Sequence, residues 1–171
     1  FEVEHSTIKA FGYEILSSYG NIVISGDFKM GSSAEKVLEN VAKLGLTKNP
    51  LALLVESTNA NKEGYCKSEL DILDNIESVI REQQNKLFII STFASNMTRV
   101  KNVIEIAQKY NQDIFVVGRN MEFSVQFMID QGLIAKSKMK FAGNVSDSYA
   151  PDKGLVLSTG CQGEPQGGLY K

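Results

Sequence analysis

Four short apolar runs constrain the fold of this chain more than any other feature of its sequence. The runs are residues 51–55, 87–91, 114–117 and 154–158. A continuous apolar run of this length predicts a strand that is buried on both faces of a sheet, and Leu51-Ala52-Leu53-Leu54-Val55 is the clearest example. Strands of this kind are typical of parallel sheets covered by helices.

The stretches between the runs carry apolar residues at helical spacing. One helix is predicted from about Ser68, a second over 96–110 and a third over 120–131. The second helix is expected to bury one apolar face, formed by Val100, Val103, Ile104 and Ala107. Strands that alternate with helices predict an α/β fold, with a mostly parallel sheet flanked by helices.

The N-terminal residues have a different pattern, which is typical of antiparallel strands. Residues 11–16 and 21–25 flank the short link 17–20, which has the composition of a hairpin loop. Between Ser32 and Gly45, a capping-box spacing and an apolar stripe predict a helix. We therefore expect an antiparallel β hairpin ahead of the parallel sheet.

Composition excludes several classes of protein. Hydrophobic residues make up 43% of the chain and charged residues 22%, as in an ordinary globular protein, which excludes a disordered tail, a collagen-like fibre and a disulfide scaffold. No apolar run approaches the ~18–20 residues of a membrane-spanning helix, so no membrane partner is expected. A net charge of −2 argues against a uniformly basic nucleic-acid binder, although a local basic rim is compatible with it. Cys66 and Cys161 lie far apart, which suits unpaired thiols in the cytoplasm.

Small, hydroxylated or glycine-rich segments follow the four predicted strands. They are residues 56–59, 91–96, 118–121 and 158–164. Ligands of open parallel sheets bind at the carboxyl ends of the strands, and two of these segments lead into a helix N-terminus, whose free N–H groups suit a phosphate. Any one segment could equally be an ordinary cap or turn. Four of them on one rim, with Arg119 among them, favour a surface for an anion or nucleotide.

Familiar catalytic patterns are otherwise missing from the sequence. The stretch Gly26–Ser33 lacks the lysine of a phosphate-binding loop, and the single histidine, His5, cannot make an H-E-x-x-H zinc site. Taken alone, the residues indicate an α/β domain with an anion-binding rim. A generic nucleotide-binding protein is therefore one interpretation that stays open.

Five groups of residues nonetheless occur in a recognisable order. They are His5-Ser6 with Phe11-Gly12-Tyr13 and Ser25-Gly26-Asp27; Glu56-Ser57-Thr58-Asn59-Ala60; Thr92-Phe93-Ala94-Ser95-Asn96; Val117-Gly118-Arg119-Asn120-Met121; and Ser158-Thr159-Gly160 with Gln162-Gly163-Glu164-Pro165. Over essentially the whole chain, this set resembles the ribonuclease J family, which combines a metallo-β-lactamase fold with a β-CASP domain. The resemblance implies that residues 1–36 are the C-terminal side of a metallo-β-lactamase region and that residues 37–171 are a β-CASP domain, incomplete at its C-terminal end. We therefore expect an internal fragment of a longer protein, since the chain opens on Phe1 without a Met.

The resemblance also implies a chemistry. In this family two metal ions, usually zinc, activate a hydroxide that attacks an RNA phosphodiester. His5 matches a histidine ligand of the metals, Asp27 matches the aspartate that bridges them, and Glu56 matches an acidic residue that supports the ligands or proton transfers. The residues implied to line the cleft for the RNA backbone or its 5′ end are Thr92, Ser95, Asn96, Arg119, Thr159 and Gly160.

The chain departs from the family pattern in its metal ligands. The H-x-H-x-D-H run is absent, and the two matching ligands are fewer than the three or four that a zinc ion normally takes. We expect that the parent protein holds two zinc ions and cleaves RNA internally, from the 5′ end, or in both ways, whereas this fragment alone holds no tightly bound zinc and is inactive. The parent would associate with a second copy or a paralogous subunit. The alternative is a non-catalytic RNA-binding or assembly subunit of a β-CASP nuclease complex.

Overall fold

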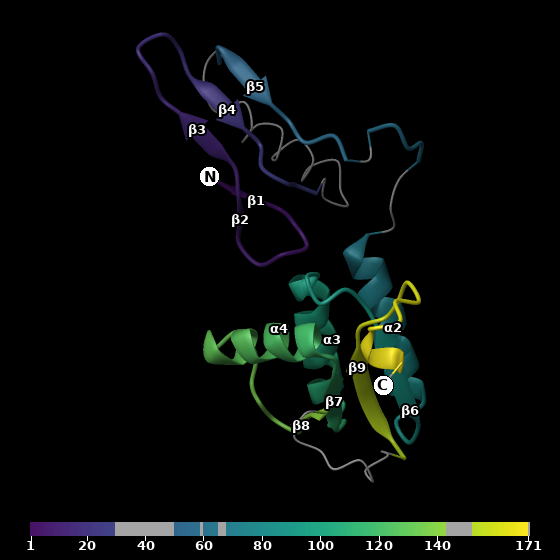
Figure 1. The fold of residues 1–171 in the computed structure, drawn as a ribbon. Coiled ribbons are helices and arrows are strands. Elements are labelled where there is room, and N and C mark those ends of the chain that lie inside the picture. The colour runs from purple at the N-terminus through teal and green to yellow at the C-terminus, as the bar shows by residue number, and fades with distance from the viewer. Residues whose placement is uncertain (30–49, 59, 65–67, 143–151, 171) are drawn as a thin grey trace. The chain divides into compact units, whose positions relative to one another are not determined.

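The computed structural model describes residues 1–29, 50–58, 60–64, 68–142 and 152–170, which belong to two units of the chain (Figure 1). The N-terminal unit is Phe1–Glu69 and the C-terminal unit is Leu70–Lys171. Each unit has its own β structure. Among the described residues, no helix is both long enough and apolar enough to cross a membrane.

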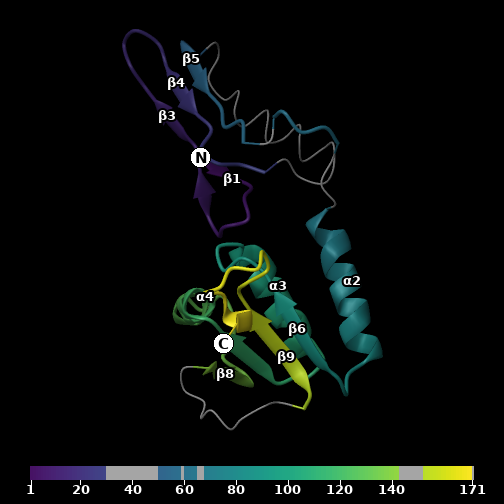
Figure 2. The same cartoon turned by 45° about the vertical axis from the view of Figure 1, so that its right-hand side comes forward.

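A four-stranded parallel sheet is the centre of the C-terminal unit (Figure 2). Its strands lie in the order β6 (Leu87–Ser91), β9 (Gly154–Ser158), β7 (Ile114–Val117) and β8 (Met139–Phe141). All three neighbouring pairs are parallel. The last strand in the chain therefore lies between two earlier ones, and Leu155 and Leu157 of β9 are completely buried.

Among the described residues, three helices accompany this sheet, and they confirm the helices predicted from about Ser68, over 96–110 and over 120–131. They are α2 (Glu69–Glu82), α3 (Met97–Lys109) and α4 (Arg119–Asp130). The apolar face predicted for α3 is buried at each of its four positions, and α4 buries Met121, Val125 and Met128. Helix α4 packs beside α3 and against β7.

A side-chain cluster joins α2 to α3. The Glu77 carboxylate on α2 accepts hydrogen bonds from Lys109 Nζ at 2.5 Å and from the Tyr110 hydroxyl at 2.8 Å. The pKa of Glu77 is lowered by these two hydrogen bonds, that from Lys109 first. The same contacts raise the pKa of Lys109 and of Tyr110, because each loses a favourable partner when it deprotonates.

One strand of the parallel sheet differs from the sequence prediction. The run at 51–55 was expected to join the other three, but its strand, β5 (Ala52–Leu54), lies in the N-terminal unit. The fourth strand is instead β8, in a lysine-rich stretch without a continuous apolar run. Only Met139 of this edge strand is buried, while Lys140 places its Nζ 5.4 Å from the centre of the Phe115 ring. Edge strands commonly carry lysine, so this strand lacks the hydrophobic signal of a central one.

The N-terminal unit contains two small sheets. In the first, β1 (Glu2–Val3) pairs antiparallel with β2 (Ala10–Phe11). In the second, β4 (Ile22–Ile24) pairs antiparallel with β3 (Tyr13–Ile15) and parallel with β5. The predicted hairpin is therefore confirmed as β3 and β4. The helix predicted between Ser32 and Gly45 lies outside the described residues.

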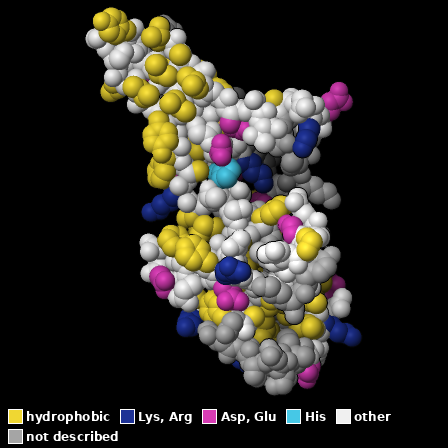
Figure 3. All heavy atoms as spheres, viewed as in Figure 1, with side chains coloured by type: hydrophobic (Ala, Val, Ile, Leu, Met, Phe, Trp, Pro, Cys, Tyr) yellow, Lys and Arg dark blue, Asp and Glu magenta, His cyan; other side chains and the backbone are white. Residues whose placement is uncertain are grey.

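The expected burial of β5 on both faces is wrong. Leu53 is 50% exposed and Leu54 is 52% exposed, because β5 lies at the edge of a three-stranded sheet. Figure 3 shows hydrophobic side chains gathered over this unit. Its exposed apolar residues are Phe11, Tyr13, Ile15, Leu16, Tyr19, Leu51, Leu53, Leu54 and Val55. The same expectation is wrong for β6, the other edge strand with an apolar run, since Leu87 is 37% and Ile89 is 59% exposed. In the parallel sheet, only the inner strands β7 and β9 bury most of their apolar side chains.

Candidate functional site

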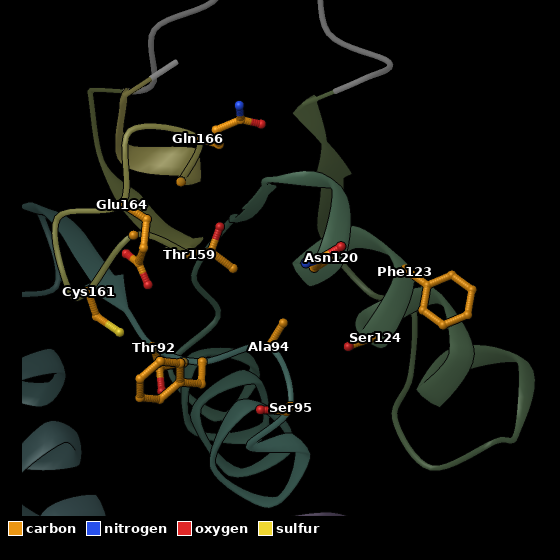
Figure 4. Close-up of a pocket in the computed structure, with 13 residues that line it drawn as sticks. Thr92, Ala94, Ser95, Asn120, Phe123, Ser124, Thr159, Cys161, Glu164 and Gln166 are labelled. Carbon is orange, nitrogen blue, oxygen red and sulfur yellow. The ribbon is translucent and has the colours of Figure 1, made fainter.

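A pocket of about 530 Å³ lies in the C-terminal unit, between the segments that follow β6 and β9 and the start of α4 (Figure 4). Its lining residues are Thr92, Phe93, Ala94, Ser95, Asn120, Phe123, Ser124, Thr159, Gly160, Cys161, Glu164, Gln166 and Gly167. This volume falls within the ~300–1,000 Å³ that is usual for small-ligand pockets.

The register of the parallel strands explains why these segments meet. Ser158 at the end of β9 is paired with Ser91 of β6 on one side and with Val117 of β7 on the other. The three strands therefore end at one edge of the sheet, where ligands of open α/β sheets bind. The sequence predicted this meeting for the segments after 91, 117 and 158. The segment after β5, with Glu56, was expected on the same rim and instead belongs to the N-terminal unit.

Hydrogen bonds fix the β6 and β9 segments to each other. The Thr92 amide donates to the Ser158 carbonyl at 3.0 Å and joins the two segments, and within the β9 segment the Ser158 hydroxyl donates to the Thr159 carbonyl at 3.0 Å. Thr92 is 5% exposed and Ser158 only 1% exposed. Both polar residues are thus buried with partners, which gives this side of the pocket a defined shape.

The chain after β9 returns over the strand ends and forms another wall of the pocket. The Gly168 amide, in the short helix η2 (Gly168–Tyr170), donates to Thr159 Oγ1 at 3.0 Å, and the Leu169 amide donates to the Thr159 carbonyl at 3.1 Å. Opposite, Gly118 has a φ of 104°, and a Cβ there would lie 2.8 Å from Thr159 Oγ1. Helix α4 therefore begins in close contact with the β9 segment, at a position that favours glycine.

The two helices that start at this edge have different N-termini. Asn96 caps α3, because its Oδ1 accepts from the Arg99 amide at 3.2 Å. Asn96 was predicted to bind substrate, but it is a cap and is not a lining residue. Helix α4 starts at Gly118 without a side-chain cap, so its first turn presents backbone N–H groups beside the lining residue Asn120. Such a helix end favours negative charge.

Among the described residues, the pocket lining combines apolar and polar side chains and carries no cationic one. Hydroxyl and amide groups come from Thr92, Ser95, Asn120, Ser124, Thr159 and Gln166. Arg119, which was predicted to contact substrate, is exposed and is not a lining residue. The charged group of the lining is the Glu164 carboxylate, which accepts from the Gln162 amide at 3.1 Å. Hydrogen bonding, rather than attraction by lysine or arginine, is what this lining offers a ligand.

Four residues predicted to contact substrate line the pocket, namely Thr92, Ser95, Thr159 and Gly160. Asn120 lies in the predicted rim segment 118–121, whereas Phe123 and Ser124, further along α4, were not predicted. Asn120, Phe123 and Ser124 lie at positions i, i+3 and i+4 of α4 and all line the pocket. Helical periodicity could have found them, because they lie on one face and the buried residues of α4 on another.

In the N-terminal unit, three hydrogen bonds bring together the segments that carry His5, Asp27 and Glu56. The Ser25 amide donates to the Leu54 carbonyl at 2.9 Å, and the Glu56 amide donates to Ser25 Oγ at 3.1 Å. The Lys29 amide donates to the carbonyl of Glu4, the residue before His5, at 2.7 Å. The ends of β1, β4 and β5 therefore meet within this unit.

The three side chains have different surroundings. His5 Nδ1 accepts from the Thr7 amide at 3.2 Å and lies 2.8 Å from the Thr7 hydroxyl, so in this arrangement a neutral ring carries its proton on Nε2. Asp27 is exposed. The pKa of Glu56 is lowered, first by a hydrogen bond from the Thr58 amide at 2.8 Å to Oε2, then by the Thr58 side chain and, more weakly, by the charge of His5.

The imidazole and carboxylate groups of these side chains suit a zinc ion, but their arrangement does not form a complete metal site. Imidazole nitrogen and carboxylate oxygen are both common zinc ligands. Within the described parts of the chain, however, no group of three or more His, Cys, Asp or Glu residues is placed to hold a metal ion.

Comparison with known proteins identifies the class of the domain and then the family. The family model for the ribonuclease J beta-CASP domain matches residues 85–171, which include all four strands of the parallel sheet and the whole pocket lining. The chain belongs to the ribonuclease J family, as its motifs indicated.

Three relatives show how much of such a protein the chain covers. It is 34% identical to ribonuclease J of Mycoplasma genitalium, over 99% of the chain and 30% of that relative. It is 33% identical to ribonuclease J of Thermus thermophilus, over 100% of the chain and 30% of that relative. It is 32% identical to ribonuclease J2 of Bacillus subtilis, over 100% of the chain and 31% of that relative. The chain thus spans less than a third of the length of these curated relatives.

Proposed function

We propose that this chain is the RNA-holding part of a metal-dependent ribonuclease that hydrolyses RNA phosphodiesters. The observation that carries the proposal is the coincidence of the family match, residues 85–171, with the parallel sheet whose strand ends form the pocket. In this proposal residues 1–36 belong to a metallo-β-lactamase region and residues 37–171 to the β-CASP domain. The parent protein cleaves RNA internally, from the 5′ end, or both.

The pocket would take the RNA backbone or its 5′ end. Ser95 and Thr92 approach it from the segment after β6, and Thr159 and Gly160 from the segment after β9. Their hydroxyl and backbone groups suit phosphate oxygens and ribose hydroxyls. Asn96 contributes indirectly by fixing the start of α3, and Arg119 supplies positive charge outside the lining.

The metal centre of the parent protein would draw two of its ligands from this chain. His5 and Asp27 would hold zinc, and Glu56 would support them from the end of β5. When bound, the two zinc ions supply a Lewis-acidic centre that makes water nucleophilic. Since this chain contributes only part of the ligand set, it binds zinc weakly and is inactive alone. The parent acts in the cytoplasm, as a homo-oligomer or with a paralogous subunit.

RNA binding by the 171-residue chain tests the role of the pocket. The probe is a fluorescent, 5′-phosphorylated single-stranded RNA octamer followed by anisotropy, with a mononucleotide as competitor. Replacing Ser95 and Ser124 together with alanine should weaken binding about tenfold, since each lost hydrogen bond costs roughly 0.5–1.5 kcal/mol. Ser137→Ala, an exposed serine outside the pocket lining, is the matched control. Unchanged affinity in the double variant would contradict the proposed role of the pocket.

Zinc titration by calorimetry tests the incomplete metal centre. The wild-type chain should show no sub-micromolar zinc site and should leave the RNA octamer intact with zinc present. A sub-micromolar site that disappears in His5→Ala and Asp27→Ala would show that this chain holds its metal unaided and would overturn that part of the proposal.

A further inference from the structure

Two aromatic side chains of the pocket lining are open to solvent. Phe123 is 75% exposed and Phe93 is 49% exposed. A single exposed aromatic residue is unremarkable on a protein surface. Here, however, two of them come from separate segments, the loop after β6 and the helix α4, and border the same polar pocket.

The register of α4 determines where Phe123 points. Met121, Val125 and Met128 are buried in the core, which orients the helix. Phe123 therefore shares the opposite, pocket-lining face with Asn120 and Ser124. Figure 4 shows its ring at the outer edge of the pocket, beyond Asn120 and Ser124. The ring thus lies at the α4 side of the pocket, away from Thr159, and is exposed to solvent.

The segment that carries Phe93 is held by its own turn. The Asn96 amide donates to the Phe93 carbonyl at 3.0 Å, and the Asn96 side chain caps α3. The backbone at Phe93 is thus tied to both β6 and α3, while its ring stays half exposed. A ring on a fixed backbone loses little further freedom when a ligand covers it.

The chemistry of the lining selects one kind of ligand. Its described residues offer two aromatic rings, several hydroxyl and amide groups and the Glu164 carboxylate, and no lysine or arginine is among them. A nucleobase has a π face that stacks on aromatic rings and polar edges that accept and donate hydrogen bonds. We infer that Phe93 and Phe123 form a stacking platform for the bases of single-stranded RNA. This inference rests on the proposed function and adds that the pocket binds the bases of the RNA as well as its backbone.

The test compares two RNA probes on the 171-residue chain. One is a labelled oligoadenylate octamer and the other is an abasic ribose-phosphate octamer of the same length. Phe93→Ala and Phe123→Ala should each weaken oligoadenylate binding by about fivefold or more, because base stacking supplies part of the affinity. Both variants should bind the abasic octamer as the wild type does. Equal weakening for the two probes, or none for oligoadenylate, would overturn the platform.

Phe127→Ala is the matched control. Phe127 lies one turn further along α4 and is 44% exposed, but it is not a lining residue. Its replacement should leave oligoadenylate binding within about twofold of the wild type, on the scale of stacking losses. An equal loss in this variant would overturn the assignment to the pocket. A wild-type chain that binds neither octamer would instead reject the proposed function, so the two failures are distinguishable.

A fluorescence readout keeps the inference testable if an alanine variant misfolds. The sequence contains no tryptophan, so Phe123→Trp introduces a single reporter at the α4 side of the pocket. Tryptophan keeps an aromatic face, so this variant should retain binding, and stacking on adenine should quench its emission. Unchanged emission at saturating oligoadenylate would overturn the platform.

Discussion

The N-terminal and C-terminal units place apolar strands in different surroundings. Leu157 of β9 lies in the centre of a four-stranded sheet and is completely buried, whereas Leu54 of β5 lies in an edge strand and is 52% exposed. The C-terminal unit also has helices with buried apolar faces, on α3 and α4. The C-terminal unit therefore has its own hydrophobic core. The described strands of the N-terminal unit leave much of their apolar surface exposed to solvent.

Leucine-to-alanine substitution in the two strands gives the largest expected effect. Leu157→Ala should lower the free energy of unfolding of the C-terminal unit by about 2–5 kcal/mol, because it leaves a cavity in a close-packed core. Leu54→Ala, the matched variant, should cost no more than about 1 kcal/mol, because half of the side chain is already in water. Urea unfolding followed by circular dichroism measures both. Equal losses in the free energy of unfolding would show that Leu54 is buried in solution. The two strands would then not differ in burial.

A pair of glycines tests what holds the described strands of the N-terminal unit together. Gly26 follows β4 with a φ of +63°, and a Cβ there would lie 2.4 Å from the Phe11 carbonyl oxygen. Gly64 in the same unit has a φ of +96° and nothing within 4 Å. Gly64→Ala should therefore cost only the ~1–2 kcal/mol of a left-handed backbone. Gly26→Ala should cost more, since a backbone oxygen cannot move aside.

Amide hydrogen exchange, resolved by residue, measures the glycine pair and locates the effect. In Gly26→Ala, exchange should accelerate at the ends of β4 and β5 and leave β9 protected as in the wild type. If β9 also lost protection, the two units would unfold together. They would then differ in how their strands are packed but would not be stable independently of each other.

Local patterns in the sequence predicted the helices because their cause is local. The apolar face of α3 is a matter of spacing along one segment, so Val100, Val103, Ile104 and Ala107 could be assigned from the sequence. The partners of a strand are not local. The runs that became β5 and β9 look alike, and only long-range pairing decides which is central. An edge strand such as β8 needs no continuous apolar run, so it was missed.

The same distinction applies to the candidate site. Thr92, Ser95, Thr159 and Gly160 directly follow strands, and the rule that strand ends carry ligands predicts their place in the lining. Phe123 and Ser124 lie inside a helix, where their sequence context is that of any amphipathic segment. Arg119 and Asn96 lie in the same segments but outside the pocket lining, and Asn96 caps α3. Their contact with substrate stays a prediction.

The smallest expected effect concerns two carboxylates, one in each unit. The pKa of Glu77 is lowered by Lys109 and Tyr110, which belong to another helix, whereas that of Glu56 is lowered chiefly by the amide of Thr58, two residues away. A lowered pKa in the folded state means that the carboxylate stabilises the fold above the pKa of the unfolded chain. This contribution is lost as the pH falls through the folded value.

Glu77→Gln should therefore remove part of the acid sensitivity of the C-terminal unit, while Glu56→Gln should leave that unit unchanged. The effect should be small and should shrink with added salt, because Lys109 is exposed and Glu77 is only half-buried. The phenol of Tyr110 gives a second readout. Its pKa is raised first by the hydrogen bond to Glu77, so it should fall toward its ordinary value in Glu77→Gln. Urea unfolding between pH 3 and pH 7, with a pH titration of the Tyr110 ring by NMR, would measure both. An unchanged pKa of Tyr110 in Glu77→Gln would show that the hydrogen bond from Tyr110 to Glu77 does not persist in solution. The apolar core would then stabilise the C-terminal unit without help from this cluster.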